Sequence, residues 1–335
     1  MSEAIAVSYG LGIGSVSLEM LVFHMLGLRF SVDALLMPWL GLVAVNSIIC
    51  FAQGGRLSQD ARELGLAPNQ GPAPVDVLLG CGIAFEVLYA AFRALIKPIE
   101  SYDAVAIYAI RSKIFYLAKS IPADYFPSIA RLFPHADYPL NIQLSETFMY
   151  MSMDCLNDAL VKIIFPLFFA ATLCVLYFAL RRSAGRTYAL VFTFILASIP
   201  HYNNYATNAY LEVPLAFYIF VGGVFLVRWI EDSSAGAMAL SAVSAALAGW
   251  TKNEGLMYCA IFAALAFASV VFRFRRASMK DIFCAFAYSG IILCVTLPWA
   301  AVKAKWGIAN EEIALANLNP ANLARQLPKL GAVFY

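Results

Sequence analysis

One acidic side chain stands at the beginning of an amphipathic segment, immediately after a long apolar run. The segment ESYDAVAIYAIRSKIFYLAK, residues 100–119, carries Asp103 near its start and Arg111 in its middle. Asp is a favoured helix N-cap because its carboxylate accepts a backbone N–H, so a structural role is one interpretation of Asp103. The other is a general base that takes a proton from an incoming hydroxyl or amine. Spacing leaves both interpretations open.

A second segment, HADYP at 135–139, places a possible proton carrier beside another carboxylate. His135 and Asp137 stand together, and the Tyr138-Pro139 step restricts the backbone that follows them. A single histidine in a loop is usually an ordinary surface residue. Together the pair is also a plausible part of a proton-transfer site.

Two further segments offer charge next to apolar runs. GWTKNEGL, residues 249–256, contains Lys252 and Glu254, which either form a solvated turn or line a cavity. A lysine in a cavity pairs with phosphate as a compact point charge. Glu212, in YLEVPLAF, is either an interfacial carboxylate or part of the same site.

The composition around these segments is that of a polytopic membrane protein. The chain has 335 residues, of which 62% are hydrophobic and 13% are charged, whereas soluble domains carry about 25% charged residues. The net charge of +2 gives no sign of nucleic-acid binding. The seven cysteines and the His, Asp and Glu residues lack metal-ligand spacing, so we expect neither a metal nor a cofactor.

Apolar runs predict an all-α fold with about nine transmembrane helices, because a spanning helix needs about 20 apolar residues. The predicted helices are 4–28, 34–53, 75–97, 156–180, 187–200, 209–230, 236–250, 255–272 and 282–302. We divide the chain into 1–74, with two helices and a cytoplasmic loop, a core at 75–305 and an outer loop at 306–335.

Charge asymmetry between the loops predicts the orientation, since cytoplasmic loops are rich in Lys and Arg. With a cytoplasmic N-terminus, the inner loops collect ten cations: Arg56, Arg62, Arg181, Arg182, Arg186, Arg228, Arg273, Arg275, Arg276 and Lys280. Segment 98–155 then lies outside, and a bacterial inner (plasma) membrane fits this pattern. Within that segment, 103–119 has helical periodicity and is expected to lie flat in the membrane interface. Four prolines then indicate an ordered loop: Pro122, Pro127, Pro134 and Pro139.

Charges inside the apolar runs support a different class of function. Glu19 and Glu86 fall within predicted helices, and Asp158 and Lys162 are spaced as an i,i+4 pair that would neutralise itself. Ionisable residues at membrane depth often mark transport pathways, so a transporter or flippase is an alternative.

Taken together, SYDAVAIYAIRSKIFYL, HADYPL, YLEVPLAF and TKNEGL resemble the polyprenol-dependent GT-C integral-membrane glycosyltransferases. The nearest branch contains the protein O-mannosyltransferases and the lipid A aminoarabinose transferase. The resemblance covers roughly residues 75–305 and depends on the order and the membrane side of the four motifs.

The resemblance implies an inverting transfer of a sugar from a polyprenyl-phosphate donor to an acceptor outside the membrane. Asp103 matches the acidic residue that activates the acceptor, and His135 and Asp137 match a second loop motif. Lys252 becomes a candidate for the donor phosphate, with Glu254, Arg111, Tyr138 and Glu212 as further substrate-binding residues. The expected partners are the donor lipid, an unidentified acceptor and the bilayer.

Three departures from the family pattern leave alternatives open. Many relatives have two adjacent acids in the first outer loop, but Ala104 follows Asp103, so the second acid is either Glu100 or Asp137. HADYP lacks the paired prolines common in relatives. The chain also stops at Tyr335, whereas relatives generally continue, so a truncated or non-catalytic membrane subunit is the third interpretation.

Overall fold

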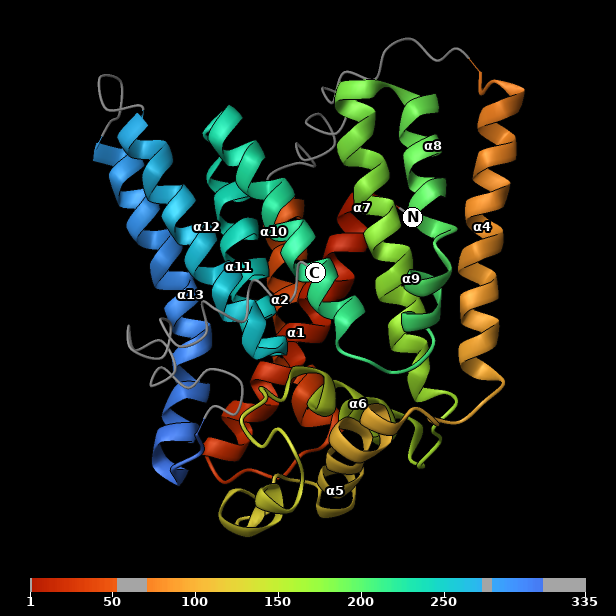
Figure 1. Cartoon of the computed structure of the whole chain (residues 1–335). Helices are drawn as coiled ribbons and strands as arrows, with labels where there is room; N and C mark the ends of the chain where they lie inside the picture. The colour runs from red at the N-terminus through yellow and green to blue at the C-terminus, as the bar shows by residue number, and fades with distance from the viewer. Residues whose placement is uncertain (1, 53–70, 273–278, 310–335) are drawn as a thin grey trace, which may run out of the picture.

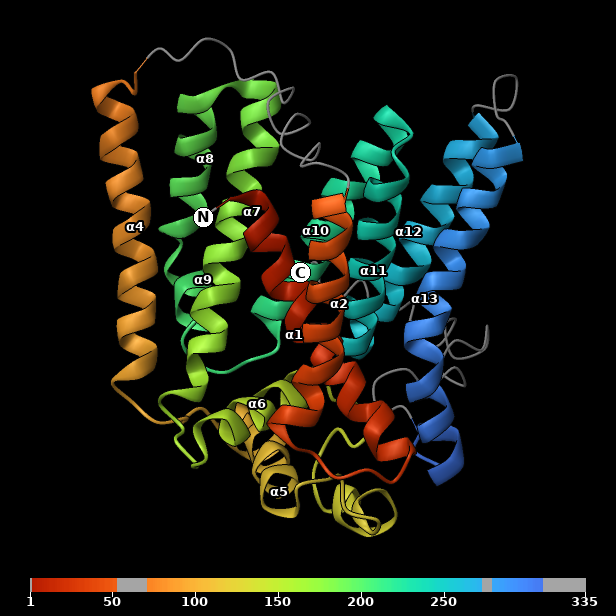
Figure 2. The same cartoon turned by 180° about the vertical axis from the view of Figure 1, so that it is seen from behind.

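The protein is a bundle of helices, with no strand in the part of the chain that the structure describes (Figures 1 and 2). This computed structural model describes residues 2–52, 71–272 and 279–309. The predicted inner-loop cations Arg56, Arg62, Arg273, Arg275 and Arg276, and nearly all of the predicted outer loop 306–335, lie outside the described residues.

Among the described residues, seven helices are long and apolar enough to cross a membrane, as the composition predicts for a membrane protein. They are α1 (Glu3–Met25), α2 (Val32–Ala52), α4 (Pro74–Leu95), α7 (Ile164–Ala184), α10 (Glu212–Asp232), α12 (Asn253–Phe272) and α13 (Met279–Trp306). Two shorter apolar helices, α8 (Arg186–Ala197) and α11 (Ala235–Thr251), pack between them, and α9 (Pro200–Tyr205) is a short connection.

The predicted helix at 156–180 begins later than expected. Asp154 adopts a left-handed backbone conformation with φ 51°, and a 3-10 turn, η4 (Val161–Ile163), precedes α7. Asp158 therefore lies in a turn before the helix, and its ion-pair partner is not the predicted Lys162.

The long segment between α4 and α7 folds across one end of the bundle, which we call the α5–α6 end (Figures 1 and 2). It contains the π-helix η1 (Ala104–Ala109), α5 (Ile110–Ala118), the short turns η2 (Tyr125–Ile129) and η3 (Ala130–Leu132), and α6 (Asn141–Met153). Residues 104–118 are thus helical. Their position at a membrane interface stays a prediction.

Helix α1 lies in the middle of the bundle, against α6, α7 and α11. The hydroxyl of Tyr9 donates to the carbonyl of Ile164 over 2.8 Å, and the hydroxyl of Tyr218 donates to the carbonyl of Gly10 over 2.7 Å. A Cβ atom at Gly14 would meet a methyl group of Leu247 at 2.6 Å. A larger residue at position 14 would therefore require the Leu247 side chain to shift where α1 approaches α11.

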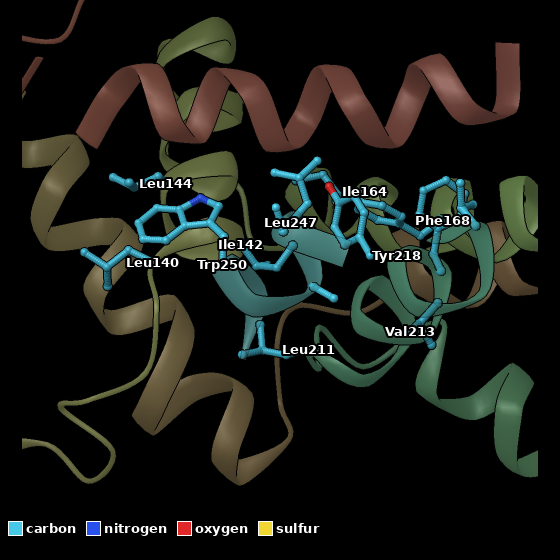
Figure 3. Close-up of a cluster of buried hydrophobic side chains, with 14 of the residues drawn as sticks. Leu140, Ile142, Leu144, Ile164, Phe168, Leu211, Val213, Tyr218, Leu247 and Trp250 are labelled. Atoms are coloured by element: carbon cyan, nitrogen blue, oxygen red, sulfur yellow. The ribbon is translucent and has the colours of Figure 1, made fainter. Parts of the chain in front are cut away.

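A buried polar cluster joins α1, α6 and α11 just inside the α5–α6 end. Trp250 donates its indole N–H to the Ser17 hydroxyl over 2.8 Å, and Ser17 donates to the Asn141 side chain over 2.7 Å. Asn141 in turn donates to Thr251 over 2.8 Å. Apolar side chains surround this cluster, with Leu140 and Leu144 drawn beside Trp250 in Figure 3. These bonds fix the end of α11, and so the position of Lys252.

Candidate functional site

Lys252 is held between two carboxylates at the turn from α11 to α12. Its ammonium nitrogen lies 2.7 Å from Glu254 and 3.4 Å from Glu212, and 5.6 Å from the centre of the Tyr138 ring. Burial by itself lowers the pKa of Lys252, but the hydrogen bond to Glu254 and the charges of both glutamates outweigh it, so the pKa is raised. Lys252 is therefore a permanent cation.

The turn that carries Lys252 depends on a glycine. The backbone of Lys252 is extended, and the N–H of Gly255 donates to its carbonyl over 2.9 Å. A Cβ atom on Gly255 would lie 2.0 Å from the carbonyl oxygen of Ala248. Any larger residue would push α11 and α12 apart and would move Lys252 and Glu254.

The HADYP segment packs against this turn. Asp137 is fully buried, and one of its carboxylate oxygens accepts a hydrogen bond from the side chain of Asn253. The Asp137 carbonyl accepts the indole N–H of Trp299 over 3.3 Å. His135 and Tyr138 stack with their ring centres 4.5 Å apart. The segment is therefore a fixed part of the α5–α6 end.

Arg111 anchors the same segment from the side of α5. One guanidinium nitrogen, Nη2, donates to the carbonyls of Pro134 at 2.8 Å and of His135 at 3.0 Å. His135 has a left-handed backbone with φ 57°, and these bonds stabilise that conformation. Arg111 is fully buried, yet Nε and Nη1 have no hydrogen-bond partner within the described residues.

Burying these two nitrogens is costly, because no acceptor among the described residues offsets their desolvation. The Tyr125 hydroxyl is also buried without a partner among the described residues. Burial raises the pKa of Tyr125 to about 12, and the charge of Arg111 acts on it in the opposite direction. Arg111 and Tyr125 together thus offer donors to an anion or to water.

Asp103 lies at the start of η1 with an exposed side chain. It occupies the N-cap position but makes no side-chain capping bond, so the structural interpretation of this residue lacks its expected hydrogen bond. Asp103 forms no hydrogen bond or ion pair with any described residue. Its carboxylate is exposed to solvent.

Tyr108 connects Asp103 with the other charged residues. Burial raises the pKa of Tyr108, followed by the charges of Glu212 and Asp103, whereas the charge of Arg111 lowers it and that of Glu254 raises it. Asp103, Arg111, Glu212 and Glu254 therefore all lie within electrostatic reach of this one tyrosine. The structure thus brings Asp103, Arg111, Glu212 and the Lys252 turn to one region. It links Asp137 and His135 to that region through Asn253 and Arg111, not through Asp103.

The two glutamates within the apolar helices α1 and α4 have structural partners. Glu19 accepts the indole N–H of Trp39 over 2.8 Å, and Glu86 accepts from Asn203 over 3.2 Å. These contacts are what helix–helix hydrogen bonding requires.

The expected Asp158–Lys162 ion pair is wrong. Asp158 forms an ion pair with Lys113 at 2.7 Å and accepts the Tyr150 hydroxyl over 2.9 Å. Lys162 instead donates to the carbonyl of Pro98 over 3.1 Å. The i,i+4 spacing has no meaning here, because Asp158 precedes the helix that contains Lys162.

Several polar residues of this region are not among the site residues predicted from the sequence. Asn253 sits inside the TKNEGL motif, and its position at the start of an apolar helix was the available signal. Gln143 and Glu146, three residues apart in α6, are both fully buried. Residues at that spacing lie on one face of a helix, and the structure turns this face inward.

Comparison with protein-family models, with curated proteins and with solved structures found no significant match to this chain.

Proposed function

We propose that this protein is a glycosyltransferase that moves a sugar from a polyprenyl-phosphate donor to an acceptor at the α5–α6 end. The observation that carries the proposal is that side chains from four segments far apart in sequence lie together at the α5–α6 end. These are Asp103 and Arg111, the HADYP loop, Glu212, and the Lys252 turn. A base, cations and buried polar donors in one place are what transfer from a phosphate-linked donor needs.

The orientation and the span count belong to the same proposal. We place the α5–α6 end outside the membrane and the N-terminus in the cytoplasm of a bacterial cell. The shorter helices α8 and α11 then also cross, which makes nine spans, and η1 with α5 lies in the interface. The packing of α8 against α4 and α7, and of α11 against α10, α12 and α13, supports this count.

In the proposed reaction, a hydroxyl or amine of the acceptor attacks the anomeric carbon of the sugar. Asp103 takes the proton of the acceptor as the new bond forms. The bond from the anomeric carbon to the phosphate oxygen breaks, and polyprenyl phosphate leaves with the electron pair. Direct displacement inverts the anomeric centre. An exposed carboxylate without a hydrogen-bond partner among the described residues suits the base.

The leaving phosphate needs cations that are already in position. Lys252 is a permanent cation, and Arg111 keeps two nitrogens without acceptors in the described part of the chain. We assign both to the donor phosphate, with the polyprenyl chain in the bilayer. Tyr138 presents its ring to Lys252, and Asp137 positions the turn through Asn253. The scheme calls for no metal.

The decisive experiment is sugar transfer by the purified full chain, supplied with a set of polyprenyl-phosphate sugars. We expect transfer by the wild type and a loss of about 100-fold or more for Asp103→Asn, the usual contribution of a general base. Asp124→Asn, an exposed acid of the same segment, is the matched control and should retain transfer.

Full transfer by Asp103→Asn would remove Asp103 from the role of base. No transfer by any of the three folded proteins would overturn the transferase assignment and favour an accessory membrane subunit.

A further inference from the structure

A small cationic pocket lies beside the candidate site, where α4 ends and α7 begins. Its volume is about 90 Å³, enough for several water molecules or one phosphate group. Its lining residues come from the end of α4, the following turn, the η4 turn before α7 and the loop after α9: Arg93, Ile96, Lys97, Glu100, Lys162, Thr207 and Asn208.

The pocket carries an excess of positive charge. Three cations, Arg93, Lys97 and Lys162, face a single carboxylate, Glu100. Glu100 is already bound to Lys97 at 2.9 Å, and Arg93 donates to the side chain of Asn204 over 3.1 Å. Two formal positive charges therefore lack a carboxylate within the pocket.

Lys162 makes this excess significant, because only 3% of its surface is exposed. An ammonium group has three donors, and Lys162 makes one hydrogen bond within the described residues, to the carbonyl of Pro98. The nearest candidate counter-ion by sequence, Asp158, is bound to Lys113. A buried cation of this kind favours an anion in the pocket.

An apolar stripe on α4 leads directly to the pocket. Phe85, Tyr89, Phe92 and Ile96 follow one another at helical spacing, and each exposes between 44% and 64% of its surface. Ile96 belongs both to the stripe and to the pocket lining. The guanidinium of Arg93 lies 5.7 Å from the centre of the Tyr89 ring, at the border between the two. In a membrane-spanning helix, such a stripe faces lipid chains.

We propose that this pocket binds the phosphate headgroup of an anionic membrane phospholipid whose acyl chains lie along the α4 stripe. Cationic pockets between membrane helices recognise lipid phosphates in this way. The hydrogen bonds of Arg93, Lys97 and Lys162 go to Asn204, Glu100 and Pro98, so the pocket has a bonding network of its own. The lipid would brace α4 against α7 beside the segment that leads to Asp103. The proposal does not depend on glycosyl transfer.

The test is titration of the delipidated full chain in a neutral detergent, read by native mass spectrometry. The probes are short-chain phosphatidylglycerol, phosphatidylcholine with the same chains, undecaprenyl phosphate and inorganic phosphate. We expect phosphatidylglycerol to bind at least about tenfold more tightly than phosphatidylcholine. Removal of each cation should lower the affinity for phosphatidylglycerol about fivefold. Arg93→Gln should therefore bind it about fivefold more weakly, and the double variant Arg93→Gln, Lys97→Gln about 25-fold more weakly.

Lys119→Gln is the matched control, since Lys119 is an exposed cation at the same end of the bundle and outside the pocket. It should bind phosphatidylglycerol as the wild type does. Arg93 and Lys97 are not fully buried, and circular dichroism will establish that the variants fold. Lys162→Met probes the buried cation separately.

The proposal is overturned if the two phospholipids bind equally, or if the double variant binds phosphatidylglycerol like the wild type. Equal binding of inorganic phosphate would reduce the pocket to a simple anion site. Tighter binding of undecaprenyl phosphate, lost in the same variants, would instead assign the pocket to a polyprenyl lipid.

Discussion

Asn253 donates a side-chain hydrogen bond to the carboxylate of Asp137, 116 residues earlier in the chain. Both residues are buried, at 2% and 0% exposure. The bond joins the start of α12 to the HADYP segment, and Arg111 joins that segment to α5. One buried contact thus couples the turn that carries Lys252 to the loop that carries His135.

Asn253→Asp should destabilise the protein more than Asn253→Ala does. The alanine variant loses a donor to a buried carboxylate, which costs about 1–3 kcal/mol. The aspartate variant in addition places a second carboxylate against Asp137, and like charges in a buried site repel. Thermal unfolding in detergent at pH 7 measures both. An unfolding temperature for Asn253→Asp equal to or higher than that of Asn253→Ala would contradict the proposed contact between Asn253 and Asp137.

Lys252→Ala should weaken binding of the polyprenyl-phosphate donor more than binding of the acceptor, because Lys252 is assigned to the phosphate. Glu254→Gln should have the opposite effect on donor affinity, since it releases Lys252 from the nearer of its two carboxylates. We expect a change of roughly five- to tenfold in each direction, typical of one charged hydrogen bond at a partly exposed site. Titration of donor binding measures both variants.

Lys252→Arg keeps the charge and serves as the control for loss of the cation. Donor affinity that is equal in wild type and Lys252→Ala would remove Lys252 from the phosphate site. A fall in affinity for Glu254→Gln would assign Glu254 itself to the donor.

The helices could be predicted from the sequence because bilayer thickness sets the length of an apolar run. The predicted ends of α4, 75–97, and of α13, 282–302, fall within a few residues of Pro74–Leu95 and Met279–Trp306. Alternation of the helices also predicts which loops share a membrane side. That Asp103, HADYP, Glu212 and Lys252 face the same end follows from this alternation.

Helix α6 and its contacts could not be predicted in the same way. Its sequence begins NIQLSET, which is polar enough for a loop, and it forms a helix because Asn141, Gln143 and Glu146 are buried against other helices. The Lys113–Asp158 ion pair joins residues 45 positions apart through that fold. Tertiary packing determines such contacts, and they cannot be predicted from local spacing in the sequence.

The membrane orientation predicts a labelling pattern in intact cells. In a variant with its own cysteines replaced, Asp124→Cys should react with a membrane-impermeant thiol reagent, because residue 124 is exposed at the α5–α6 end. Glu231→Cys, exposed at the end of α10, is the matched control and should react only after permeabilisation. A tag at the N-terminus should resist external protease. The reverse pattern for the two cysteines would invert the proposed topology.

Glu146 should make stability fall as the pH rises through neutrality. It is fully buried in α6, and burial raises the pKa of its carboxyl to about 8, against a smaller opposite effect of the hydrogen bond from Ser112. The folded state therefore holds a proton that the unfolded chain, with a glutamate pKa near 4.5, has released. Stability from this group is complete below about pH 4.5 and is lost as the pH rises towards 8.

Glu146→Gln retains an acceptor for Ser112 and cannot ionise, so its stability should lack this slope. Unfolding measured from pH 5 to 9 should place the variant progressively above the wild type, by about 1 kcal/mol for each pH unit up to about pH 8. Glu100→Gln is the control: the Lys97 hydrogen bond lowers the pKa of Glu100, so this exposed group is already ionised throughout that range. Its profile should parallel that of the wild type. Parallel profiles for wild type and Glu146→Gln would mean that Glu146 is ionised in the folded protein, where the positive charge of Lys113 favours the ionised carboxylate.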